Sequence, residues 1–134
     1  MTKLFDIAQN WLNQDPDAET HAELTALLTA AKNGDEKAHA DLQARFSDRL
    51  QFGTAGLRGP LQAGSMGMNR VLVAQAAGGL ADYLKDYDKQ PSIVIGYDGR
   101  KNSDVFARDT AEIMAGAGVK AYLLPRKLPT PVLA

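Results

Sequence analysis

The segment Phe52–Gly59 reads F-G-T-A-G-L-R-G and combines three glycines with one threonine and one arginine. Arg58 is the one charged residue between Gln51 and Gln62. Glycine lets a ligand approach the backbone closely, and the planar guanidinium of arginine matches carboxylate or phosphate oxygens. The segment therefore indicates an anion site, with phosphate as the first candidate. On glycine spacing alone, a tight structural turn is an equally good interpretation.

The common phosphate-binding motifs do not account for this segment. A P-loop needs Gly-Lys followed by Ser or Thr, and the dinucleotide fingerprint needs G-x-G-x-x-G; neither pattern is present. A later pair of glycines, Gly64 and Gly67, is interpreted as part of a surface loop. The chemistry thus rests on Arg58 and its immediate neighbours.

A second candidate turn, residues 97–102, follows the apolar run Ile93–Ile95. Such a run predicts a buried strand of a parallel sheet, and open α/β folds bind ligands at the carboxyl ends of these strands. Arg100 and Lys101 could meet an anion there, close to the N-terminus of a helix beginning at Ser103. Alternatively, Asp98 pairs with Arg100 to brace the turn, which is the interpretation we favour for Asp98.

Other reactive side chains form no recognisable constellation. The chain has no cysteine, which excludes disulfides, thiolate metal sites and cysteine nucleophiles and agrees with a reducing compartment. His21 and His39 are expected on separate helices, without a second ligand at metal spacing. Trp11 is assigned to the core, and no serine or threonine occupies a nucleophile elbow.

The composition is that of an ordinary globular protein, with 134 residues, 45% of them apolar and 23% charged. The net charge is −1, and the mixed signs and few aromatic residues argue against a nucleic-acid surface. No apolar run reaches the length of a membrane span, and the first residues lack the apolar region of a signal peptide. We therefore expect a cytoplasmic protein with a small anionic ligand and no membrane partner.

Residues 1–50 are predicted to form an N-terminal helical extension. Apolar residues recur at helical spacing in three stretches. The second helix is expected from about Asp17 to Asn33, where Asn33-Gly34 is typical of a helix C-terminus. The third is expected from about Asp35 to Phe46. No catalytic constellation is apparent in this part.

Residues 51–134 are predicted to form an incomplete first α/β domain. A short strand and a long loop should precede a helix over residues 69–87. The buried stripe of this helix is expected at Val73, Ala77, Leu80, Leu84 and Tyr87. The mid-helix pair Gly78-Gly79 is expected to permit close packing against a neighbouring element.

A strand-helix-strand unit is predicted over residues 93–124, with the two strands parallel. The expected fold is a partial three-layer α/β/α domain with a mixed, mainly parallel sheet and the helical extension in front. Residues 128–131, L-P-T-P, predict the start of a further helix. We interpret the sequence as one cut short at Ala134, in an unfinished domain.

Four segments occur in one order: F-G-T-A-G-L-R-G at 52–59, M-N-R at 68–70, I-G-Y-D-G-R at 95–100 and L-P-T-P at 128–131. This order resembles the first domain of the α-D-phosphohexomutases, the phosphoglucomutase/phosphomannomutase family. The helical start resembles the extension of its phosphopentomutase-like branch. The resemblance covers essentially the whole chain.

The resemblance implies a four-domain enzyme that moves a phosphoryl group between the 1- and 6-positions of a hexose. It implies a phosphoserine, a hexose 1,6-bisphosphate intermediate, and Mg²⁺ held by three aspartates. By the same resemblance, Arg58 reaches the phosphoserine and the sugar phosphate, Thr54 lines the same loop, and Arg100 braces the site. The family's T-A-S-H-N-P serine loop, D-G-D-x-D-R metal loop and sugar-selecting loop do not occur in this chain.

Three hypotheses remain open on the residues and the resemblance. We favour the N-terminal part of a phosphohexomutase for glucose phosphate, or else mannose phosphate, which is inactive without the catalytic serine. A stand-alone phosphosugar-binding module and a structural domain are the alternatives. Expected partners are a phosphosugar, the remaining domains of the parent enzyme, and a second copy through an unpaired sheet edge. No nucleic-acid partner is expected.

Overall fold

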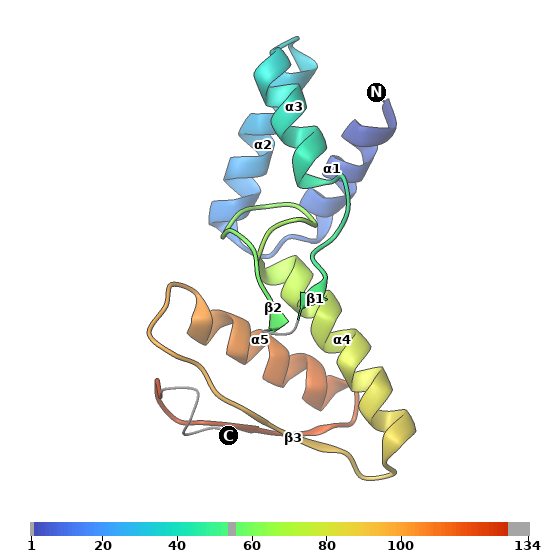
Figure 1. Ribbon diagram of the computed structural model, residues 1–134, viewed down its shortest axis with the longest axis vertical. Coiled ribbons are helices and arrows are strands. Elements are labelled where there is room, and N and C mark those ends of the chain that lie inside the picture. The colour runs from blue at the N-terminus through green and yellow to red at the C-terminus, as the bar shows by residue number, and fades with distance from the viewer. Residues whose placement is uncertain (1, 54–55, 129–134) are drawn as a thin grey trace. The chain divides into compact units, whose positions relative to one another are not determined.

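The computed structural model describes residues 2–53 and 56–128 of the chain (Figure 1). Contacts within the chain divide it into two compact units, Met1–Leu72 and Val73–Ala134. Each unit has its own hydrophobic core, and each is described by itself.

Three helices begin the first unit, as predicted: α1 (Thr2–Gln14), α2 (Ala18–Lys32) and α3 (Glu36–Arg45). Aspartates cap two of them. The Asp17 carboxylate accepts a hydrogen bond from the backbone N–H of Glu19 at 2.9 Å. That of Asp35 accepts from the backbone N–H groups of the second and third residues after it, at 3.0 and 3.1 Å. Such caps satisfy backbone donors that the helix itself leaves unpaired.

The core of the first unit lies between these helices. Leu24 and Leu42 are fully buried, and Trp11 is buried with its ring edge-to-face against Phe46, at a centroid distance of 5.6 Å. The assignment of Trp11 to the core is therefore confirmed. The helices are amphipathic, and burial of their shared apolar face is what holds them together.

A minimal hairpin follows the helices. Strand β1 (Phe52–Gly53) pairs antiparallel with β2 (Gly56–Leu57), with Phe52 opposite Leu57. One strand and a loop were expected here, and the structure adds a second strand. In the long loop that follows, Leu61 and Met68 form an isolated parallel β-bridge.

Helix α4 (Arg70–Tyr87) begins in the first unit and runs into the second. There it is followed by β3 (Ser92–Ile95), α5 (Ser103–Gly116) and β4 (Lys120–Leu123). The two strands pair in parallel, from Ser92 opposite Lys120 to Ile95 opposite Leu123. This confirms the predicted strand-helix-strand unit and the α/β class. Within the described residues, no helix is both long enough and apolar enough to cross a bilayer.

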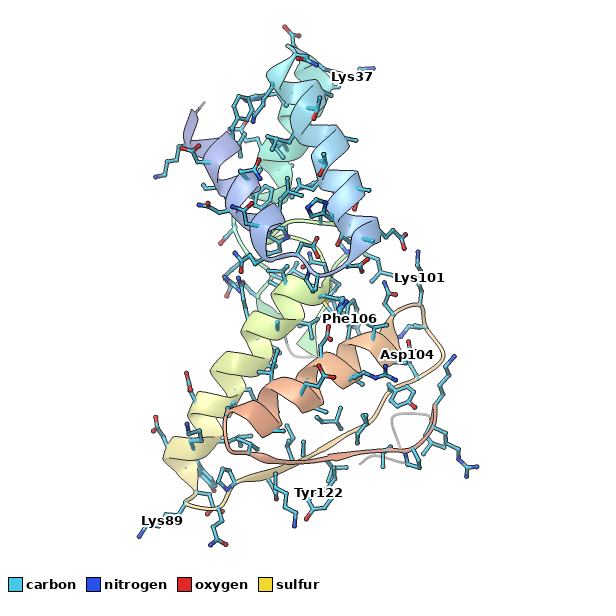
Figure 2. The ribbon with its side chains drawn as sticks, turned by 180° about the vertical axis from the view of Figure 1, so that it is seen from behind. Lys37, Lys89, Lys101, Asp104, Phe106 and Tyr122 are labelled. Carbon is cyan, nitrogen blue, oxygen red and sulfur yellow. The ribbon has the colours of Figure 1, made fainter. Side chains whose placement is uncertain are left out.

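Helices α4 and α5 lie on the same side of the two strands (Figure 1). The core between them contains Ala77 and Ala81 from α4, Met114 from α5 and Val119 before β4. The other face of the sheet carries Val94 and Tyr122, both exposed. Figure 2 shows Tyr122 pointing away from α5.

The predicted buried stripe of α4 is partly wrong. Leu80 and Tyr87 are 43% and 79% exposed, whereas Ala81 is fully buried. Tyr87 instead stacks on Tyr83, with ring centroids 6.3 Å apart. The physical reason is that the buried face of α4 in this unit is formed by Ala77 and Ala81, with Leu84 packed against them, and not by Leu80 or Tyr87. The two small alanine side chains allow the helix to approach its neighbours closely.

The expected close packing at Gly78-Gly79 is also wrong for the part of the chain that the structure describes. A Cβ atom added at either position would meet nothing within 4 Å. Both glycines lie in a regular stretch of helix, where glycine is less stabilising than alanine. They contribute no tight contact to this unit.

Candidate functional site

Arg58 directly follows β2 and is exposed. Among the described residues it has neither an ion pair nor a hydrogen-bond partner. The next residue, Gly59, lies against Leu50, because a Cβ atom there would be 2.7 Å from Leu50 Cδ1. The glycine thus permits a close contact immediately after the arginine, and the guanidinium remains available to a ligand. Thr54, the second predicted residue of this loop, lies outside the described residues.

The loop that follows Arg58 is tied together by Asn69, whose side chain is 2% exposed. Its Nδ2 group donates to the carbonyl oxygens of Gln62 and Gly64, both at 2.8 Å, and of Gly67 at 3.2 Å. Its Oδ1 atom accepts from the backbone N–H of Leu72 at 2.9 Å. One buried amide therefore satisfies several backbone groups and connects the loop to the first turn of α4.

Gly64 and Gly67 are buried, so their assignment to a surface loop is wrong. Gly64 has φ +106°, and a Cβ atom there would lie 2.8 Å from the backbone oxygen of Arg45. At Gly67 a Cβ atom would meet the carbonyl oxygen of Gln62. These positions need glycine for space and, at Gly64, for backbone conformation.

The helices hold this loop through charged side chains. Arg45 Nη1 lies 3.0 Å from Glu23 Oε1, and Arg45 Nε lies 3.1 Å from Asp41 Oδ1. The other oxygen of Glu23 accepts from the backbone N–H of Ala63 at 3.2 Å. Burial disfavours the Arg45 charge, but hydrogen bonds to Asp41 and Glu23 outweigh it and raise the pKa of Arg45. The helical extension thereby anchors the segment after Arg58, a role that the residue pattern did not reveal.

Arg100 lies in a braced turn at the end of β3, in the second unit. Its Nε atom is 2.9 Å from Asp98 Oδ2, and its backbone N–H donates to Asp98 Oδ1 at 3.1 Å. The backbone N–H of Asp98 donates to Ser103 Oγ at 3.1 Å. The hydrogen bond from the Arg100 backbone is the main reason that the pKa of Asp98 is lowered. This confirms the bracing interpretation of Asp98.

The Arg100 side chain remains 86% exposed despite this ion pair. The helix after the turn begins at Ser103, with Asn102 as the residue before it, in left-handed conformation at φ 67°. No side chain caps this helix by a hydrogen bond to its first turn, and the Ser103 hydroxyl accepts from the backbone N–H of Asp98. The turn is therefore fixed by side chains from both of its ends.

A cavity of about 400 Å³ opens beside this turn, at the carboxyl ends of β3 and β4. It is lined by Tyr97, Asp104, Arg108, Leu123, Pro125, Arg126 and Lys127. Three of these residues are basic, and none of them was predicted as a site residue. These basic residues come close together only because β3 pairs with β4. No local sequence motif indicates that they do.

The described residues offer no metal centre: no three His, Asp or Glu side chains among them come close enough to hold an ion. His21 is exposed, and His39 packs edge-to-face on Phe5 at a centroid distance of 6.0 Å. Both histidines therefore have the surface or packing roles expected for them. The Mg²⁺ ion that the family resemblance implies does not fit the ligands in this part of the chain.

Comparison with known proteins gives one family. Residues 49–134 match the family model described as phosphoglucomutase/phosphomannomutase, alpha/beta/alpha domain I. A probable phosphomannomutase of Haemophilus influenzae is 94% identical over 69 residues, which cover 52% of this chain and 14% of that protein. Phosphoribomutase of Saccharomyces cerevisiae is 41% identical over 122 residues, covering 90% of this chain and 19% of the yeast protein.

Phosphoglucomutase of Staphylococcus haemolyticus is 43% identical over 89 residues, which cover 66% of this chain and 16% of that protein. The chain thus spans less than one fifth of the length of each of these three relatives. No solved structure shows a significant match.

Proposed function

Because this chain belongs to the phosphoglucomutase/phosphomannomutase family, we propose that it forms the N-terminal part of a phosphohexomutase. The full-length enzyme interconverts hexose 1-phosphate and hexose 6-phosphate through a phosphoserine and a bisphosphorylated sugar. Relatives named as phosphomannomutase, phosphoribomutase and phosphoglucomutase support the reaction class. The chain by itself contributes part of the site and has no mutase activity.

The observation that carries this proposal is the exposure of the Arg58 side chain. Its guanidinium is exposed and unpaired among the described residues, next to a glycine that contacts Leu50 closely. The loop beyond it is held by Asn69 and by Glu23 of the helical extension. An unpaired arginine on an anchored loop is suited to bind phosphate oxygens with little loss of conformational freedom.

In the proposed site, Arg58 binds the phosphoryl oxygens of the substrate and of the phosphoserine. Positioning and charge neutralisation are the main demands of phosphoryl transfer, because the reacting group carries negative charge throughout. Thr54 supplies a hydroxyl from the same loop. The family resemblance gives Arg100, which is held by Asp98, a bracing role in the full-length enzyme.

Mg²⁺ supplies charge neutralisation at the phosphoserine when it is bound. Its ligands and the serine are proposed to belong to other parts of the full-length protein. The residues of this chain contribute only binding and orientation of the phosphate group.

The proposed domain organisation is a helical extension over residues 1–50, followed by the first α/β domain from residue 51 onward. Glucose phosphate is the proposed substrate and mannose phosphate the second choice, with hexose 1,6-bisphosphate as the intermediate. The enzyme is proposed to work in the cytoplasm. This chain is proposed to function together with the remaining domains of that enzyme. Pairing of two copies through the open sheet edge is a further proposed contact, since β3 and β4 form a two-stranded sheet.

Substitution of Arg58 in the full-length protein tests the proposal. Arg58→Ala should lower kcat/KM for glucose 1-phosphate by roughly 100-fold, because a bidentate charge-assisted contact is lost. Arg58→Lys should recover only part of this loss, because an ammonium group lacks the planar fork. Lys89→Ala, an exposed cation before β3, is the matched control and should leave the rate unchanged.

Equal activity of Arg58→Ala and the unaltered protein would refute the assigned role. A mutase assay on the chain alone provides a second criterion, and clear turnover there would contradict the absence of the nucleophile. The alternative, a phosphosugar-binding module, predicts that the chain alone binds glucose 6-phosphate and that Arg58→Ala abolishes this binding. Calorimetric titration of the chain and of its Arg58→Ala variant distinguishes the mutase proposal from the binding module. The mutase proposal needs the other domains of the enzyme for a complete site, whereas the binding module does not.

A further inference from the structure

The segment 60–68, named the closed loop below, begins two residues after Arg58. Its two ends meet, because the backbone N–H of Met68 donates to the carbonyl oxygen of Pro60 at 2.8 Å. The amide of Asn69 joins its middle, where Nδ2 donates to three carbonyl oxygens of the closed loop. Asn69 is 2% exposed, so that water cannot readily replace these hydrogen bonds. The shape of the closed loop therefore depends strongly on this buried side chain.

Glu23 of α2 holds the closed loop from the helical extension. Its Oε2 atom accepts from the backbone N–H of Ala63 at 3.2 Å, and Ala63 is fully buried. The side chain of Arg58 has no partner among the described residues. Asn69 and Glu23 can therefore influence Arg58 only through the backbone of the closed loop.

The connection between the closed loop and Arg58 is short and stiff. The ring of Pro60 fixes its own φ, and Gly59 lies so close to Leu50 that a Cβ atom there would be 2.7 Å from Leu50 Cδ1. The backbone N–H of Leu50 in turn donates to the carbonyl oxygen of Ser65 at 2.9 Å, within the closed loop. A displacement of the closed loop is therefore transmitted to the backbone at Arg58, because the residues between them have little freedom to absorb it.

We propose that Asn69 is a positioning residue for Arg58, and that Glu23 of the helical extension assists it. Both side chains act by fixing the closed loop, which determines where the Arg58 guanidinium meets the phosphoryl oxygens. This role rests on the proposed function, because it requires that Arg58 binds the phosphoryl group. Positioning matters greatly in phosphoryl transfer, since a displacement of about 1 Å can lower a rate by a factor of about 100. The helical extension thereby takes part in the reaction without touching the substrate.

Asn69→Ser in the full-length protein separates the loop contacts of Asn69 from its contact with α4. Serine can still accept a hydrogen bond from the backbone N–H of Leu72, because serine and asparagine are similarly good helix caps. Its short hydroxyl cannot join the carbonyl groups that the amide connects. We expect kcat/KM for glucose 1-phosphate to fall about tenfold. Glu23→Gln, which keeps the shape of the side chain, should lower kcat/KM about threefold.

A double-mutant cycle with Arg58→Ala distinguishes positioning from a general structural role. If Asn69 acts through Arg58, the double variant N69S/R58A should match Arg58→Ala in kcat/KM within about twofold, because no guanidinium remains to be positioned. A structural role would instead multiply the two losses.

Asp35→Ala is the control for lost stability. It removes the cap of α3 in the same unit, a side chain that binds backbone groups of its own helix. The variant should unfold at a lower urea concentration and keep kcat/KM within about twofold of the unaltered protein. Circular dichroism of each variant verifies the fold.

Three results would overturn the positioning role of Asn69 while Arg58→Ala is impaired, and would leave the proposed function standing. They are an unchanged kcat/KM in Asn69→Ser, losses that multiply in the double variant, and an equal loss in Asp35→Ala. An unchanged kcat/KM in Arg58→Ala would instead refute the proposed function and the positioning role together. If Asn69→Ser does not fold, the same cycle with Glu23→Gln decides, and full activity of Glu23→Gln would then overturn the positioning role.

Discussion

Glu23 and Arg45 form an ion pair across α2 and α3, with Arg45 Nη1 3.0 Å from Glu23 Oε1. The pair does more than join two helices, because Glu23 also accepts a hydrogen bond from the backbone N–H of Ala63 at 3.2 Å. The carboxylate thus connects the helical extension to the loop that follows Arg58. It links residues that no local pattern would associate.

Glu23→Gln should destabilise the first unit by about 1 kcal/mol. The amide retains the shape of the side chain, but it cannot offer two charged acceptors to Arg45 and Ala63. The cost is limited because Glu23 is partly exposed and the charges are screened. Urea denaturation of the chain measures the change. Glu112→Gln, at an exposed position of α5 without a partner among the described residues, is the control and should cost less than about 0.5 kcal/mol.

Asp98→Asn should lower the melting temperature near neutral pH and have a smaller effect in acid. The native state lowers the pKa of Asp98 below its usual value of 3.8. Its carboxylate therefore contributes stability above that value, and the contribution disappears as pH falls through the native pKa. Melting curves of both proteins at pH 7 and pH 3 provide the comparison. A difference that stays constant between the two pH values would contradict this assignment.

Two glycine substitutions should act in opposite directions. Gly79→Ala should stabilise α4 by about 0.5–1 kcal/mol, because the added Cβ has open space and alanine is the better helix former. Gly64→Ala should destabilise by about 2 kcal/mol or more, since its φ is +106° and the Cβ would approach the backbone oxygen of Arg45. Thermal unfolding of both variants tests the pair, and a stabilised Gly64→Ala would refute the argument.

Local patterns were enough to predict the three helices of the extension and the strand-helix-strand unit. Asp17 and Asp35 supply caps within two or three residues of the groups they bind, and the apolar run around Val94 identifies β3. The bracing of Arg100 by Asp98 also spans only two residues. Each of these features depends on neighbours in the sequence, so that it can be recognised without the fold.

Features that depend on distant contacts were missed. Ala81, not Leu80, faces the core, because the choice of buried face depends on what α4 packs against. The role of Asn69 depends on the path of the loop that it binds. The three cations of the cavity come together only through the pairing of β3 with β4 and the folding back of Arg126 and Lys127.

The hydrogen bond between Ala63 and Glu23 also bears on the order of folding. It joins residues that are 40 positions apart, whereas α2 and α3 are neighbours along the chain and meet through local contacts. Closing the longer segment costs more conformational entropy. We therefore expect this bond to form after the folding transition state, so that Glu23→Gln accelerates unfolding and leaves the refolding rate nearly unchanged. In stopped-flow experiments, the loop carrying Arg58 should be the last part of the first unit to become ordered.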